Sequence, residues 1–120
     1  MITVLTALAG GFGAAARFLV DTLVARHSRL SVPLGTLVVN VSSCFLLGLV
    51  TGWLVGHTPG SPLVAILGVG LLGGYSTFST ASVEGVRLIR EGRPWSALVH
   101  AGGMLAGSLV ASVLGLALTM

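Results

Sequence analysis

The sequence predicts an all-α membrane protein with four transmembrane helices in a single domain, residues 1–120, and with the third helix broken at its centre. Composition indicates the class, because 54% of the residues are hydrophobic, 8% are charged and the mean hydropathy is +1.04. In soluble domains about a quarter of the residues are charged. Four apolar segments, roughly 2–24, 33–55, 63–86 and 95–118, each have the ~20 residues that cross a bilayer.

The charged and reactive residues argue against two kinds of protein. The net charge of +3 comes from six arginines and three acids, and the arginines form no continuous stripe of the kind that binds nucleic acid. Cys44 is the only cysteine, which excludes an intrachain disulfide and a cysteine-based metal cluster. No nucleophile and base stand together in a pattern typical of an enzyme. We expect neither a nucleic-acid partner nor catalysis.

The first segment carries two charged residues within its apolar length. Arg17 and Asp21 stand four residues apart, on one face of a helix, where they can pair and let the arginine reach the interface. Alternatively, Arg17 supplies positive charge at a vestibule and draws anions toward it. The sequence leaves both roles open.

The second segment contains one strongly polar residue, Asn40, with Ser43 about one turn later. A buried amide needs partners, so an interhelical hydrogen bond is one role open to Asn40. Gly48, Gly52 and Gly56 recur every four residues, a spacing that permits close contact between helices. These glycines are therefore predicted to pack against a neighbouring helix.

The third segment has a polar run, GGYSTFST at residues 73–80, near its middle. Two adjacent glycines followed by hydroxyl-bearing and aromatic residues loosen the backbone hydrogen bonds of a helix. Irregular backbone at membrane depth is tolerated only where protein buries it or where it lines a watery cavity. The run therefore predicts a break and a functional site. The alternative is a tight helix contact, which glycine and hydroxyl residues also permit.

The fourth segment offers small residues for packing and two hydroxyls, Ser108 and Ser112, about one turn apart on a shared face. Such serines often donate to the backbone of their own helix. His100 lies two turns before Ser108 on nearly the same face; its alternatives are a donor to a pathway and an interfacial residue, and the second is favoured.

Three motifs occur in order along the chain. They are GGxGAxxRF at residues 10–18, GTLxVNxxxxFxxG at 35–48, and GGxSTFST at 73–80 with Glu84 four residues later. Together they resemble the Fluc/CrcB family of fluoride channels, and the chain has that family's usual length. The match covers residues 10–84, and the fourth segment resembles the family more loosely.

The resemblance implies a channel in the cell membrane, an antiparallel dimer through which fluoride leaves the cytoplasm passively. Such a path must replace the ion's water with hydrogen-bond donors. The implied pathway residues are Asn40, Thr77, Phe78, Ser79, Thr80, Ser108 and Ser112. Arg17 would stand at the vestibule. The resemblance also implies a structural sodium ion at the dimer centre, held by the backbone carbonyls of Gly73 and Ser76 and not transported. The family usually has threonine at the position of Ser76, and a serine there leaves the backbone carbonyl unchanged.

Ala81 departs from the family pattern, which places a second phenylalanine three residues after the first. A homodimer of this chain would have half the usual aromatic lining.

The arginines are also unevenly placed. Those on the side opposite the termini are Arg26, Arg29, Arg87, Arg90 and Arg93. The positive-inside rule makes that side cytoplasmic. Both observations favour an antiparallel heterodimer with a related chain of opposite orientation, while a homodimer stays open.

Two other functions fit a short four-helix chain. A proton-coupled multidrug exporter needs a carboxylate deep in the membrane. The acids here, Asp21, Glu84 and Glu91, lie toward helix ends or in a loop. A membrane assembly subunit would explain the glycines and short loops but not the motif at the break. Glu84 matches the family's glutamate after the break, and its alternative is an ion pair with Arg87.

Overall fold

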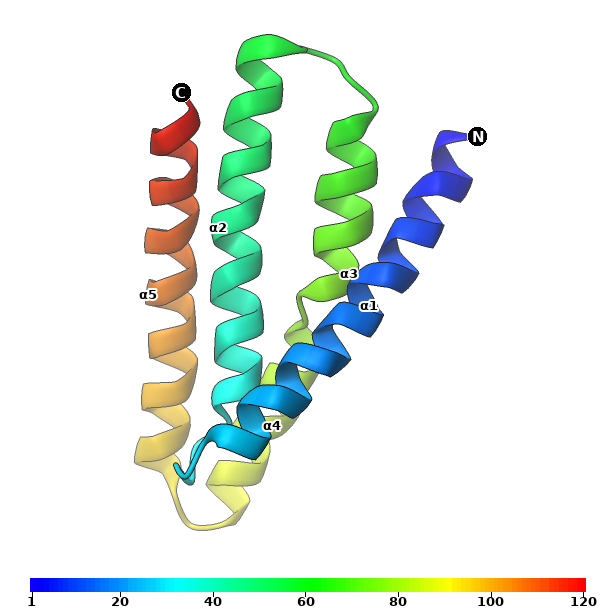
Figure 1. Ribbon diagram of the computed structural model, residues 1–120. Coiled ribbons are helices and arrows are strands. Elements are labelled where there is room, and N and C mark those ends of the chain that lie inside the picture. Colours follow the sequence, from blue (N-terminus) through cyan, green and yellow to red (C-terminus); the bar gives the residue numbers. More distant parts are fainter.

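The structure, a computed structural model, describes all residues, 1–120, and consists of helices joined by short loops (Figure 1). In chain order the elements are α1 (Ile2–His27), α2 (Leu34–His57), η1 (Val64–Leu72), α3 (Gly73–Tyr75), α4 (Phe78–Arg90) and α5 (Pro94–Thr119). η1, α3 and α4 lie along one span, so four helices are long and apolar enough to cross a membrane. The predicted fold class, with a third helix interrupted near its centre, is confirmed.

Most helices continue beyond the apolar runs from which they were predicted. α1 ends at His27 rather than at 24, α2 at His57 rather than at 55, and α4 at Arg90 rather than at 86. The reason is that a helix depends on its backbone hydrogen bonds, and polar side chains at a membrane surface do not interrupt them.

Glycine and proline set the sharp turn between α4 and α5. Gly92 has a φ of 74°, a left-handed conformation that glycine adopts without strain. Its N–H donates to the carbonyl of Ile89 at 3.0 Å, and the N–H of Arg93 donates to that of Leu88 at 2.9 Å. These two bonds form a Schellman cap. Pro94 then begins α5, at a position where a missing N–H costs nothing.

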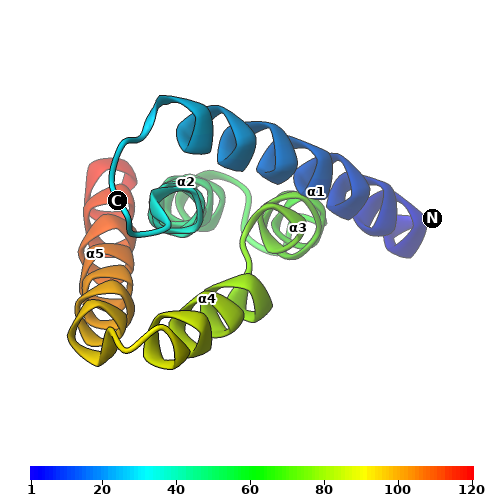
Figure 2. The same ribbon diagram turned by 90° about the horizontal axis from the view of Figure 1, so that it is seen from below.

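α1 runs beside the first half of the third span in the same direction, and glycines bring the two backbones together (Figures 1 and 2). A Cβ at Gly13 would overlap the carbonyl oxygen of Leu71, and a Cβ at Gly74 would overlap that of Gly10. Neither backbone can move aside as a flexible side chain would. This crossing therefore fixes where the middle of the third span lies against α1.

α2 and α5 also run in the same direction and share the most extensive interface of the molecule (Figure 1). A Cβ at Gly48 would overlap the backbone of Ser112, and one at Gly52 would overlap the side chain of Thr119. The predicted packing role is therefore confirmed for these two glycines. It is wrong for Gly56, which has nothing near it because α5 ends at Thr119 and leaves the last turn of α2 without a neighbour.

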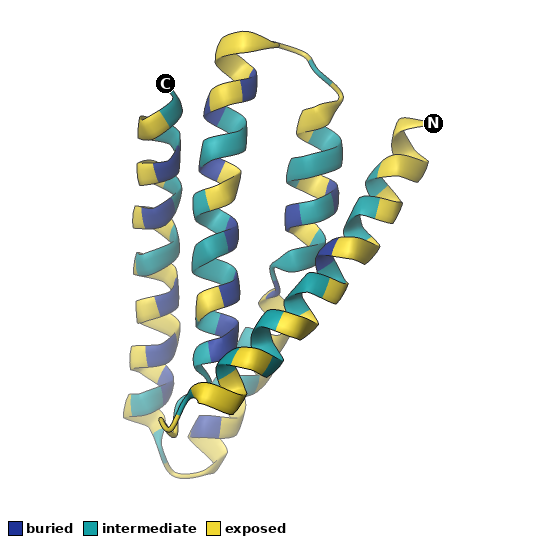
Figure 3. Cartoon of the chain, viewed as in Figure 1, coloured by how far each residue is buried: buried dark blue, intermediate teal, exposed yellow.

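Burial is concentrated where helices face one another (Figure 3). The largest fully buried side chains, Leu54, Val39 and Thr36, all belong to α2, which α1, α5 and the third span surround (Figure 2). Large apolar side chains such as Phe12 and Val69 face outward. Lipid tails solvate such side chains as well as a protein core does. Only 17 of the 120 residues are buried, because most of the apolar side chains face outward, where lipid can surround them.

Candidate functional site

The third span breaks at Ser76 and Thr77, whose backbones are extended, with ψ of 162° and 122°. Ser76 is the thirteenth of the 27 residues from Val64 to Arg90, so the break lies at the middle of the span. The two glycines before it are not the break itself. Gly73 has helical angles, and Gly74 lies against Gly10 of α1. The polar run thus contains both features that the sequence offered as alternatives, a tight contact and a break.

The turns before the break are also irregular. η1 is a π-helix, in which N–H groups bond to the carbonyl five residues earlier, as Gly73 does to Gly68. π-turns carry an extra residue in each turn and often occur at functional sites. Nothing in the apolar sequence VAILGVGLL predicts this winding.

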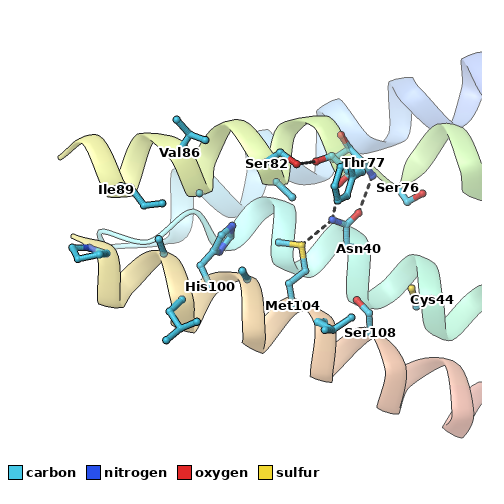
Figure 4. Close-up of a pocket in the computed structure, with 18 residues that line it drawn as sticks. Asn40, Cys44, Ser76, Thr77, Ser82, Val86, Ile89, His100, Met104 and Ser108 are labelled. Atoms are coloured by element: carbon cyan, nitrogen blue, oxygen red, sulfur yellow. Dashed lines mark hydrogen bonds between the residues drawn. The ribbon is translucent and has the colours of Figure 1, made fainter. Parts of the chain in front are cut away.

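Asn40 of α2 holds the broken backbone (Figure 4). Its Nδ2 donates to the carbonyl of Thr77 at 2.8 Å, and its Oδ1 accepts from the N–H of Thr77 at 2.8 Å. One side chain therefore replaces two backbone bonds that the helix has lost. Nδ2 also lies 3.1 Å from Sδ of Met104 on α5.

Two serines of α2 support the end of the first half-helix. Ser43 is buried, and its Oγ donates to the carbonyl of Leu72 at 3.2 Å. Ser42 and the hydroxyl of Tyr75 are 3.0 Å apart. α2 therefore presents a polar strip opposite the break, and of this strip only Asn40 was predicted as a site residue.

The second half-helix, α4, begins with a cap that its own sequence provides. Oγ1 of Thr77 accepts from the N–H of Thr80 at 3.2 Å, as an N-cap does. The same oxygen lies 3.0 Å from Oγ1 of Thr80 and 3.3 Å from Oγ of Ser79. Ser79 and Thr80 are exposed, so three predicted pathway hydroxyls form one cluster at the start of α4.

The break frees the two carbonyls that the sequence assigned to sodium. In an unbroken helix the N–H of Thr77 would bond to Gly73, but it bonds to Asn40 instead. Likewise the N–H of Thr80, the helical partner of Ser76, bonds to the Thr77 side chain. Carbonyl oxygens at the C-terminal end of a half-helix suit a hard cation. The donor set at Gly73 and Ser76 therefore fits sodium.

Arg17 lies at the break and not beside Asp21. Its Nη1 donates to the carbonyl of Ser76 at 3.3 Å, and the expected ion pair between Arg17 and Asp21 is absent. The prediction of that pair is wrong because the crossing of α1 and the third span brings a freed carbonyl within reach of the guanidinium.

A groove of about 800 Å³ runs from the break along α4 and α5 (Figure 4). Of the predicted pathway residues, those that line it are Asn40, Thr77, Phe78 and Ser108. Phe78 is 88% exposed, so its ring stands at the open side of the groove. Ala81 also lines the groove, at the position where the family has a second phenylalanine. Ser112 does not line it and lies where α5 contacts Gly48 of α2.

A buried polar cluster connects α2, α4 and α5 below the break. Oγ1 of Thr36 donates to Oε1 of Glu84 at 2.8 Å, and Oε2 of Glu84 lies 3.5 Å from Nε2 of His100. The predicted pair of Glu84 with Arg87 is wrong, because Arg87 binds Glu91 at 2.9 Å. His100 is 4% exposed and lines the groove, so its side chain lies inside the bundle and not at its outer surface. No spacing signal in the sequence joins these three helices.

A second, more polar cavity of about 340 Å³ opens among the loops on the arginine side. It is lined by all three acidic residues, Asp21, Glu84 and Glu91, together with Arg87 and the loop between α1 and α2. Glu84 lies at its inner end, since the carboxylate reaches the buried His100.

Comparison with known proteins gives consistent matches over nearly the whole chain. Residues 4–116 match the family described as CrcB-like protein, Camphor Resistance (CrcB). Fluoride-specific ion channel FluC 1 of Leifsonia xyli subsp. xyli is 44% identical over 116 residues, covering 97% of this chain and 85% of that protein. Fluoride-specific ion channel FluC 2 of Cutibacterium acnes is 49% identical, with 92% and 91% covered. Fluoride-specific ion channel FluC 2 of Rhodococcus jostii is 38% identical, covering 99% of this chain and 99% of that protein.

Proposed function

This chain belongs to the CrcB family, and from that membership we propose that it is a fluoride-selective ion channel through which fluoride leaves the cytoplasm passively. The protein crosses the membrane four times. The observation that carries the proposal is the break at Ser76 and Thr77, at the middle of a span and beside a groove that holds amide and hydroxyl donors. Irregular backbone at this depth is otherwise avoided.

Asn40 can serve the backbone and an anion together. Its Nδ2 carries two hydrogens, one of which points to the Thr77 carbonyl and the other to Sδ of Met104. A thioether is a weak acceptor, and a fluoride ion would replace it without loosening the bond to Thr77. Asn40 is therefore the donor that supports the pathway best.

The other groove-lining groups extend this path. Ser108 lies on α5, one turn beyond Met104, with a free hydroxyl. The start of α4 contributes the Thr77 hydroxyl and the positive end of a 13-residue helix, while Ser79 and Thr80 are exposed and do not line the groove. The ring edge of Phe78 carries partial positive charge. These groups replace water around an anion without any fixed cation, which would hold the ion too tightly for conduction.

We propose that the working unit is an antiparallel dimer. Gly73 is exposed and its carbonyl has lost its helical partner, so this chain alone would present an unpaired backbone group to lipid, which cannot form hydrogen bonds with it. A second chain covering the break removes that cost. Ala81 and the arginine asymmetry favour a related partner of opposite orientation, and a homodimer is the alternative.

A structural sodium ion is part of the proposal. The carbonyls of Gly73 and Ser76 would hold it, together with the same atoms of the second chain. A bound cation would offset the partial negative charge of the half-helix ends where two copies meet. Its role is in assembly, and no step of fluoride passage depends on its movement.

Efflux from liposomes that contain only this purified chain tests the function. We expect fluoride to leave much faster than chloride, and removal of sodium to slow it. Ala81→Phe is the matched variant, because it adds the missing ring without touching the break. Rapid efflux from the unmodified chain would establish a sufficient homodimer. If a related chain of opposite orientation is needed, the heterodimer is supported. Failure of both arrangements would refute the fluoride channel.

Accessibility of an epitope tag after Met120 in intact cells tests the orientation. The asymmetry of the arginines predicts that the tag is outside. Equal labelling from both sides would contradict the heterodimer and favour a homodimer of chains inserted both ways.

A further inference from the structure

We propose that His100 is a positioning residue that makes fluoride passage depend on proton concentration, through its contact with Glu84. The inference rests on the proposed channel function and adds a control that the pathway itself does not require. Its basis is the cluster of Glu84, His100 and Thr36 below the break.

One atom of each titratable group is buried without a hydrogen-bond partner, and these two atoms face each other. Oε2 of Glu84 and Nε2 of His100 are both inaccessible and lack hydrogen-bond partners, and they lie 3.5 Å apart. The other oxygen of Glu84 is held by Thr36 at 2.8 Å, which fixes the carboxylate in place. Buried polar atoms without partners are rare in native proteins and often have a functional role.

The pair joins two of the hollow regions of the molecule, because each partner lines one of them. His100 lines the groove that leads to the break, and Glu84 lines the cavity that opens on the arginine side. In Figure 4 the His100 ring extends from α5 toward α4, across the groove from Val86. In the proposed control, an anion that moves between the cavity and the groove passes this carboxylate.

The surrounding charges leave His100 as the only cation available to Glu84. α1 contributes Asp21, a second carboxylate at the same cavity, and α2 contributes the Thr36 hydroxyl; the titratable side chains of α2 are Cys44, which lines the groove, and His57, which bonds to the carbonyl of Trp53 at the other end of the helix. On α4, Arg87 is turned away and binds Glu91. When His100 is neutral, the negative charge of Glu84 opposes a passing anion. When His100 takes up a proton from water, the pair has no net charge and the electrostatic barrier falls.

Protonation of His100 should raise the fluoride flux. Fluoride passage should be slow where His100 is neutral, at high pH, and fast where it is protonated, at low pH. Rates are therefore compared from about pH 8 to about pH 5.5, the range in which histidine side chains serve as charge switches. A residue with a purely structural role would not change flux in this way.

The experiment measures initial fluoride efflux from proteoliposomes at equal internal and external pH over this range, with protein-free vesicles to subtract leakage of hydrogen fluoride. The wild-type rate should rise roughly tenfold as the pH falls, a change that corresponds to ~1.4 kcal/mol in the barrier. His100→Gln should give a rate independent of pH. Glu84→Gln should also be independent of pH, at a rate at least as high as the fastest wild-type rate.

Two outcomes would overturn the inference. One is a wild-type efflux rate that does not change with pH. The other is a pH dependence that persists in both His100→Gln and Glu84→Gln. Gel filtration in detergent establishes that each variant is folded. Because the two variants remove opposite charges, one of them still tests the inference if the other fails to fold. If the wild-type chain passes no fluoride at any pH, either alone or together with a related chain of opposite orientation, the channel function itself fails. A rapid but pH-independent flux refutes only the role of His100.

Discussion

Replacement of Asn40 by alanine should release the break without changing any residue of the third span. The wild-type side chain makes two 2.8 Å bonds to the N–H and the carbonyl of Thr77. Without them, both backbone groups lose their partners at the middle of the membrane. Thr77 is 7% exposed, so water does not replace the lost bonds fully.

The size of the effect follows from these two bonds. A buried polar group without a partner costs roughly 1–3 kcal/mol. Interhelical hydrogen bonds in membrane proteins average ~0.6 kcal/mol and reach ~1.7 kcal/mol, because the separated helices find other partners. For the two bonds of Asn40 we therefore expect a loss of about 1–3 kcal/mol in unfolding free energy. The local effect is larger at the amide itself, where each ~1.4 kcal/mol speeds exchange tenfold.

Hydrogen exchange at the Thr77 amide, in detergent micelles, is the direct assay. In Asn40→Ala the amide should exchange roughly 10 to 100 times faster. Ser108→Ala is the matched control, because Ser108 lines the same groove but makes no hydrogen bond to the break. Unchanged exchange at Thr77 in Asn40→Ala would refute the reasoning.

Asn40→Asp separates the two roles assigned to this side chain. It keeps an oxygen that can accept from the N–H of Thr77, but it removes both Nδ2 donors and adds negative charge. Protection of the Thr77 amide should therefore remain while fluoride efflux falls. Loss of protection together with normal efflux would contradict both assignments.

Three further changes test the packing and the assembly. Gly74→Ala places a Cβ against the backbone of Gly10 and should cost roughly 1–3 kcal/mol in unfolding free energy, whereas Gly11→Ala points into open space and should cost nothing, as thermal unfolding can measure. Arg93→Ala removes two hydrogen bonds to Ser31 at an exposed site, so it should cost less than ~1 kcal/mol, and an effect beyond that would mean that the loops hold the bundle together. Replacement of sodium by a large organic cation should convert a purified dimer to monomers, and an unchanged dimer mass would contradict the structural ion.

The sequence predicted the spans and the region of the break, because both depend on local composition. Apolar length selects a membrane helix, and the run at residues 73–80 is the most polar stretch inside one. It did not locate the break within that run. The glycines stay helical because α1 packs on Gly74, while α2 supplies Asn40 to replace the bonds lost at Thr77. The position of the break therefore depends on residues of α1, α2 and the third span.

The polar cluster of Glu84, Thr36 and His100 was missed for the same reason. Each residue has an ordinary local explanation, and for Glu84 the nearest arginine in sequence was the obvious partner. The observed cluster joins residues 48 and 16 positions away from Glu84 through tertiary packing. Helical spacing reports which residues share a face, but it does not report what that face meets.

Glycine packing shows where sequence spacing stops being informative in a membrane. In water, the side of a helix that faces a neighbour is apolar and the other side is polar, so a pattern identifies the buried side. In lipid both sides are apolar, and only small residues mark a contact. Gly52 and Gly56 are equally spaced on α2, yet only Gly52 meets another helix, because α5 ends at Thr119. The length of the neighbouring helix therefore decides which glycine packs, and only the folded structure contains that information.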